Sequence, residues 1–61
     1  MTLLLKIERG YSADAIVIGN VVSYIYLGDS DYMITYEDPQ RDYEMFDITI
    51  KHVTEIKEVR L

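Results

Sequence analysis

The chain contains no cysteine and no tryptophan, and only one histidine and one proline among its 61 residues. The absence of cysteine excludes disulfide frameworks and thiolate zinc sites, which commonly stabilise domains of this size. A chain this short buries only about 60% of the surface that its unfolded form exposes. The hydrophobic core must therefore suffice alone, or an oligomer must contribute.

Glycine and positive charge are also scarce. Gly10, Gly19 and Gly28 are evenly spaced, but no Lys-Ser or Lys-Thr pair follows them, so there is no phosphate-binding loop. Six basic residues against eleven acidic ones give a net charge of -5, the wrong sign for neutralising phosphates or coating an anionic membrane. We expect no direct binding to nucleic acid and no membrane association. Residues 15–28 are uncharged but too short to span a bilayer, and no export signal is recognisable, so we expect a cytoplasmic protein.

The residues that are abundant favour strands. Val, Ile, Thr, Tyr and Phe together number 24, against 8 for Ala, Leu and Gln. Strand-like runs occupy residues 3–8, 15–27, 32–37, 43–50 and 53–59. Turn residues at 28–31 and at 37–42, where Pro39 follows Asp38, separate three of these runs into an antiparallel meander over 21–50. The chain is predicted to be one all-β domain over 1–61.

Two segments allow more than one interpretation. Gly19-Asn20 is either a two-residue hairpin turn or a bend inside one long strand, and we favour the bend. From Lys51 onward the apolar residues recur every third position, which fits neither a strand nor a helix well. Our interpretation is a short 3-10 turn near 49–53, followed by an edge strand through Val59.

Five strands in about 60 residues, a bent second strand and a tight turn before the last strand resemble the small SH3-like or Sm-like barrels. The likeness covers most of the chain and implies a five-stranded antiparallel barrel. It implies no single function, because this architecture serves protein ligands, nucleic acids and self-assembly alike.

The strands carry apolar side chains on both faces, although only one face can point into the core of so small a fold. Tyrosine offers large contact area at low entropic cost and is common in interface hot spots. The candidate contact tyrosines are Tyr24, Tyr26, Tyr32, Tyr36 and Tyr43. Residues 21–27 are uncharged and strongly β-forming, so they must be central, covered, or paired with another chain.

The acidic residues are concentrated in the meander. Between Gly28 and Asp47 there are seven acids against Arg41 alone. Charge confined to one unit steers a partner better than scattered charge. The candidate acidic contact residues are Asp29, Asp31, Glu37, Asp38, Asp42 and Glu44.

No pattern in the sequence indicates catalysis. His52 has no nucleophile or orienting acid at a recognisable spacing. Asp29-Ser30-Asp31 lacks the other ligands of a calcium loop. A closed barrel of this size leaves hardly any room for a ligand pocket of about 300 Å³. We therefore expect no enzyme activity, no cofactor and no metal.

The sequence predicts a non-catalytic protein-binding module that uses its tyrosines and acids. In size and charge it resembles the phage or mobile-element inhibitors that occupy the basic cleft of a nucleic-acid enzyme. The first alternative is a self-assembling subunit, at its simplest a homodimer, that pairs strands between copies. A weaker alternative is single-stranded nucleic-acid binding by tyrosine stacking.

Overall fold

The computed structural model describes residues 1–60, which form six β-strands and one 3-10 helix. The strands are β1 (Thr2–Arg9), β2 (Ser12–Ile18), β3 (Val21–Gly28), β4 (Asp31–Asp38), β5 (Glu44–Ile50) and β6 (Val53–Val59). The 3-10 helix η1 (Pro39–Arg41) lies between β4 and β5. The prediction of an all-β fold is confirmed.

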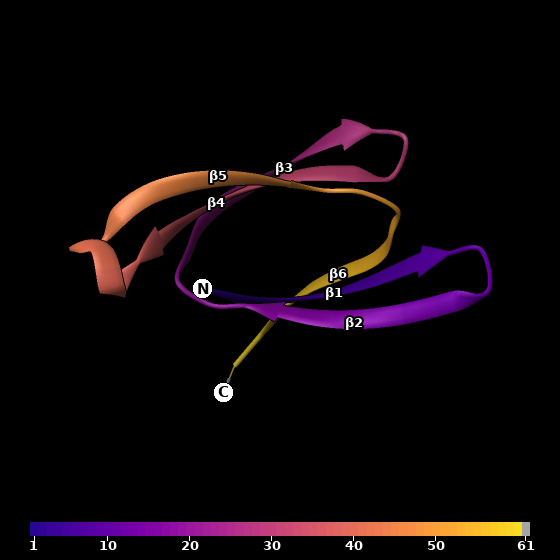
Figure 1. The fold of residues 1–61 in the computed structure, drawn as a ribbon, viewed down its shortest axis with the longest axis horizontal. Coiled ribbons are helices and arrows are strands. Elements are labelled where there is room, and N and C mark those ends of the chain that lie inside the picture. Colours follow the sequence, from indigo (N-terminus) through magenta and orange to yellow (C-terminus); the bar gives the residue numbers. More distant parts are fainter. Residues whose placement is uncertain (61) are drawn as a thin grey trace.

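The strands form two antiparallel sheets of three, in the orders β2-β1-β6 and β3-β4-β5. Residues 19–20 and 51–52 connect the two sheets at opposite sides of the molecule (Figure 1). The second sheet is the meander predicted over 21–50, with its hairpin turn at Asp29 and Ser30. Both turn residues have positive φ, at 53° and 65°, which is the requirement of a type I′ hairpin turn.

The segment predicted as one long strand over 15–27 is two strands, so the structure has six strands rather than five. β2 pairs with β1 and β3 pairs with β4, and no ladder joins β2 to β3. The hairpin alternative at Gly19-Asn20 is therefore wrong. The chain instead bends at Asn20, where φ is 57°, and passes from one sheet to the other.

The predicted closed barrel is not confirmed, because the two sheets remain separate along residues 1–60. A few backbone bonds join them. Met1 and Val21 exchange two hydrogen bonds of 2.8 Å, and the amide of Val53 donates to the carbonyl of Ser30 at 2.8 Å. These contacts fix the sheets at two corners and leave the space between them partly open.

The 3-10 turn is not at 49–53 as predicted. That segment contains the end of β5, a two-residue connection and the start of β6. His52 completes the connection with φ of 61°, which leaves no room for a helical turn. The observed 3-10 helix starts at Pro39 instead, whose ring fixes φ near the helical value. The predicted edge strand through Val59 is confirmed as β6.

The core is small and comes mainly from β1. Alternate residues of that strand point between the sheets, so its apolar residues at odd positions are buried. The buried side chains are Leu3, Leu5, Ile7, Val21, Ile34 and Val53. Eight further apolar residues, including three tyrosines, are only partly buried around them.

The molecule is less compact than a typical domain of its length. Its radius of gyration is 11.9 Å, against about 10.5 Å for a typical domain of this length. Its accessible surface is 4598 Å², against about 4,100 Å² for a monomer of 7.1 kDa. The chain therefore exposes roughly 500 Å² more surface than a compact monomer.

Candidate functional site

The five candidate tyrosines do not form one patch. Tyr24, Tyr32 and Tyr36 are half-buried and pack against the core between the sheets. Tyr26 and Tyr43 are more than 60% exposed. The rings that sequence reasoning assigned to a partner thus serve, in part, to cover a core that aliphatic residues alone do not fill.

The tyrosine rings separate along the long axis of the second sheet. Near the β3–β4 turn, Tyr32 packs against both Tyr24 and Tyr26, with ring centroids 6.4 and 5.2 Å apart. Toward the other end, Tyr36 packs against Phe46 at 6.0 Å. The tilted geometries are typical of stable aromatic pairs.

The acids also divide into two groups. Asp29 and Asp31 lie at the β3–β4 turn, whereas Glu37, Asp38, Asp42 and Glu44 surround η1 at the far end of β4. The seven steps along β4 separate the groups by roughly 20 Å. The acidic surface is therefore two local clusters, and the larger one contains η1.

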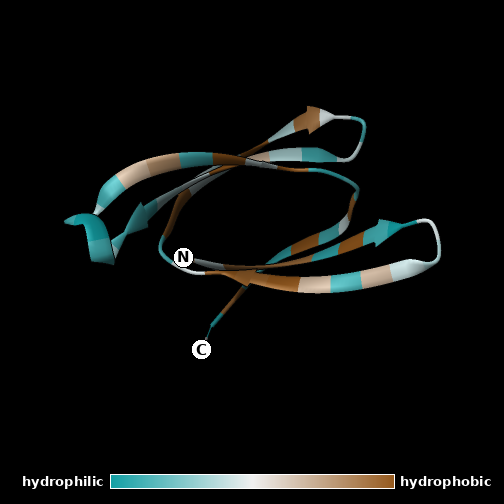
Figure 2. Cartoon of the chain, viewed as in Figure 1, coloured by the Kyte–Doolittle hydropathy of each residue, from teal (hydrophilic) through white to brown (hydrophobic). Residues whose placement is uncertain are grey.

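We call the residues at this larger cluster the acidic end. It comprises Glu37, Asp38, Arg41, Asp42, Tyr43, Glu44 and Met45. Figure 2 shows η1 as a hydrophilic turn at one end of the molecule. Four carboxylates against one guanidinium give it a net charge of -3.

Hydrogen bonds around Asp38 hold the acidic end in one conformation. The Asp38 carboxylate accepts a hydrogen bond from the amide of Gln40 at 2.9 Å, so it caps η1. Its other oxygen lies 3.7 Å from Nε of Arg41, and its carbonyl accepts from the amide of Tyr43 at 2.9 Å. The Arg41 guanidinium in turn lies 5.5 Å from the ring centroid of Phe46.

Tyr43 lies in an unfavourable backbone conformation at the centre of the acidic end. Asp42 and Tyr43 both adopt left-handed backbone angles, with φ of 53° and 59°. This region is acceptable for aspartate but costs about 1–2 kcal/mol for a residue with a bulky side chain. The Tyr43 ring is nevertheless 62% exposed, and Met45 beside it is 61% exposed. A tyrosine with an unfavourable backbone conformation is thus exposed to solvent at the acidic end.

Met45 was not among the residues that we expected at a site. The signal was present in the sequence, since Met45 alternates with Asp47 and Thr49 on the face of β5 opposite Phe46, Ile48 and Ile50. Its register partner on β4 is Glu37, so a methionine and a carboxylate lie side by side on the outer face of the sheet.

A second exposed region follows the free edge of β3. Of the nine large apolar side chains that are exposed in residues 1–60, four belong to this one strand: Val22, Ile25, Tyr26 and Leu27. The sequence predicted that residues 21–27 need a central, covered or paired position, and the structure places them at an edge.

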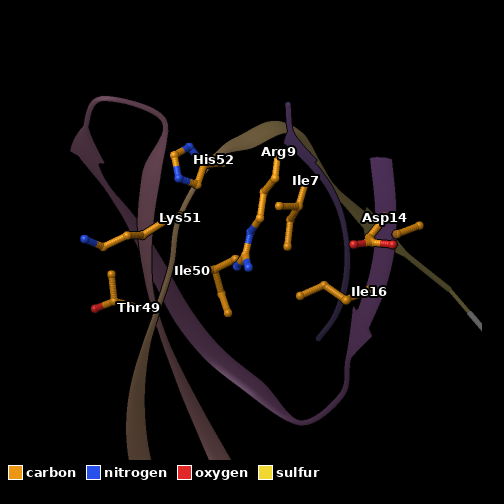
Figure 3. Close-up of a pocket in the computed structure, with 9 residues that line it drawn as sticks. Ile7, Arg9, Asp14, Ile16, Thr49, Ile50, Lys51 and His52 are labelled. Atoms are coloured by element: carbon orange, nitrogen blue, oxygen red, sulfur yellow. The ribbon is translucent and has the colours of Figure 1, made fainter. Parts of the chain in front are cut away.

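An open cleft between the sheets was not expected. Its volume is about 800 Å³, so the prediction that the fold leaves no room for a pocket is wrong, because the sheets do not close. Figure 3 shows the Arg9 side chain extending between Ile7 and Ile50, with Ile50 on the opposite sheet and Asp14 on the same sheet as Arg9. Lys51 points away from Arg9 in the same view. The described lining residues include no nucleophile hydrogen-bonded to a base.

No family model matches the chain, and no curated protein or solved structure is significantly similar to it. Residues 1–60 contain no group of three metal-ligating side chains placed to hold an ion. The same part of the chain contains no helix long and apolar enough to cross a membrane.

Proposed function

We propose that the protein is a non-catalytic protein-binding module whose acidic end contacts a basic surface of another protein. One observation carries the proposal: Tyr43 and Met45 are exposed at a capped, hydrogen-bonded turn that also carries four carboxylates. Neither side chain contributes to the buried core, so both remain available for a contact with a partner.

The chemistry of the acidic end suits a contact with a basic protein. An aromatic ring and a methionine supply apolar contact area, and methionine adapts to irregular surfaces. The surrounding carboxylates steer a basic partner and fix its orientation. The cap at Asp38 orders the loop before binding, which reduces the entropy that association must overcome.

The size of the acidic end suits a local contact. Duplex DNA carries roughly 16 charges over about 27 Å, whereas this end carries four carboxylates around one turn. The proposal therefore extends to an inhibitor, of the phage or mobile-element kind, that blocks one basic patch in the cleft of a nucleic-acid enzyme. It does not extend to imitation of a whole duplex.

The test compares two triple variants in affinity capture from the native host. The first, Glu37→Gln with Asp42→Asn and Glu44→Gln, removes three charges and leaves the Asp38 cap intact. The matched control, Glu8→Gln with Asp14→Asn and Glu58→Gln, removes three charges from the other sheet. A captured protein should bind wild type and the control at least tenfold more tightly than the first variant. Its affinity should fall with added salt.

Tyr43→Ser supplies an independent measurement, because it removes the ring without changing the charge. It should weaken the same complex by tenfold or more, in the range of an interface anchor. If the captured protein is a nucleic-acid enzyme, wild type should inhibit it and both acidic-end variants should not. Equal binding by all four proteins would refute the proposal.

We also propose that the two sheets form an incompletely closed barrel of the SH3-like or Sm-like kind. The support is the continuity of pairing across the bend at Asn20. Met1 extends the pairing of β1 onto Val21, and the carbonyl of Asn20 accepts from the amide of Glu37 at 2.9 Å. β2 and β3 would then correspond to one bent strand of such a barrel.

The stacking of single-stranded nucleic acid stays an alternative without support from the geometry. Only Tyr26 and Tyr43 are exposed among the five candidate rings, and they lie at opposite ends of the second sheet.

A further inference from the structure

The free edge of β3 has almost no backbone partner. β3 is the outer strand of its sheet, and β4 pairs with only one of its two sides. On the other side, Met1 pairs with Val21, and no further backbone hydrogen bond reaches β3 within residues 1–60. An open edge of this kind is a template on which another strand can pair.

The four outer strands differ in how their edges are protected. Natural proteins protect an edge with charged residues, which repel or solvate an approaching strand. β2 contains Asp14, β5 contains Glu44 and Asp47, and β6 contains three charged residues. β3 contains no charged residue and no proline over its eight positions, and half of its side chains are exposed and apolar.

We propose that a second copy of this chain pairs with the free edge of β3 to form a symmetric antiparallel dimer. This inference does not depend on the proposed function, since the acidic end lies outside the contact. A twofold axis pairs the strand with an identical strand, so acids on an edge can bring like charges together. Among the four outer strands, only β3 carries no charged residue.

The pleat of the strand restricts the register of the pairing. Residues directly opposite one another must lie on the same face of the joined sheet, so the twofold axis passes through one residue of β3. An axis at Ile25, whose side chain is 49% exposed, places this residue opposite its own copy. It also places Tyr24 opposite Tyr26 of the other copy, which extends the aromatic cluster already formed with Tyr32.

Pairing along one strand edge is a small contact, so we expect a dimer of moderate affinity. The dimer should dissociate within the micromolar range accessible to sedimentation.

The first experiment is sedimentation equilibrium of the full chain between about 1 and 500 µM. The mass should rise from 7.1 kDa toward twice that value as the concentration increases. Ile25→Lys should remain monomeric, because it places two ammonium groups opposite each other. Val17→Lys on the edge of β2 is the matched control and should dimerise like wild type. A monomeric wild type at 500 µM, or a dimer unaffected by Ile25→Lys, would overturn the proposal.

The second experiment does not require the lysine variant to fold. The chain has no cysteine, so a single introduced thiol reports only on contacts between copies. Ile25→Cys treated with diamide should form a covalent dimer at least tenfold faster than Val17→Cys, because residues opposite on paired strands have Cβ atoms about 5 Å apart. Equal rates for the two variants would also overturn the proposal.

Discussion

At the scale of single residues, six non-glycine residues with positive φ determine where this chain turns. They are Asn20, Asp29, Ser30, Asp42, Tyr43 and His52. Asparagine and aspartate adopt this conformation at little cost. Tyrosine does not, so Tyr43 is the position where folding and the proposed binding function conflict.

Substitution of Tyr43 by asparagine should therefore stabilise the fold while weakening partner binding. Asn is tolerated in the left-handed region, so we expect the free energy of unfolding to increase by about 1 kcal/mol. Tyr11→Asn is the matched control, because Tyr11 is also exposed but lacks a positive φ, so the free energy of unfolding should change little. Urea denaturation measures both. A loss of stability in Tyr43→Asn would mean that the ring stabilises the monomer.

The Lys6–Glu55 ion pair provides a prediction on pH. Lys6 donates a hydrogen bond to Glu55 across 3.0 Å, and this bond, followed by the positive charge, lowers the pKa of the Glu55 carboxyl. A lowered pKa in the folded state stabilises the fold at neutral pH, and the contribution is lost as the pH falls through that pKa. Carboxyl NMR titration should show that Lys6→Gln raises the pKa of Glu55 toward its ordinary value. An unchanged titration would mean that the pair does not form in solution.

At the scale of elements, the loop between β4 and β5 depends on the cap of η1. Asp38→Ala removes the acceptor for Gln40 and the contact with Arg41, and should decrease the free energy of unfolding by about 1 kcal/mol. Asp31→Ala is the matched control, since Asp31 makes no side-chain hydrogen bond or ion pair within residues 1–60.

The Asp38→Ala variant also separates the contribution of loop order to binding from the contribution of charge at the acidic end. If preorganisation contributes to binding, Asp38→Ala should reduce the affinity for a captured partner more than Glu44→Gln does, although each variant removes one charge. Equal effects would show that only the charge matters there.

At the scale of the whole molecule, the small core makes stability sensitive to each buried residue. Ile34 is completely buried at the centre of the second sheet, so Ile34→Ala should cost about 2–5 kcal/mol. A single core of this size supplies only about 3–5 kcal/mol in total. We expect Ile34→Ala to be largely unfolded at 25 °C by circular dichroism. Ile25→Ala, at an exposed position, should remain folded.

Salt should affect the two proposed contacts differently. The paired β3 strands carry no charge, so the affinity of the dimer should change little with salt. Binding of a basic partner at the acidic end should weaken over the same range. Sedimentation and binding measurements at 20 and 300 mM NaCl test this contrast. A dimer that weakens with salt would indicate pairing through opposite charges at another surface.

Most of the strands could be predicted from the sequence, because they depend on the conformational preferences of neighbouring residues. Alternation in β1, the Pro39 turn and the hairpin at Asp29 and Ser30 each follow from the preferences of a few neighbouring residues. The 3-10 turn expected near 49–53 was wrong, because the backbone angle of His52 depends on a connection between two sheets. The single long strand was wrong for the same reason, since β1 and β4 pair with different halves of it.

The sequence alone determined the all-β class, the meander and the concentration of acids within it, because these depend on residue type and near neighbours. Only the tertiary structure decided which apolar side chains remain exposed outside the core. Three of the suspected tyrosines cover the core, whereas Tyr43, Met45 and the free edge of β3 face solvent. That division depends on which strand edges meet and how far two sheets close, and both are set by contacts between residues distant in the chain.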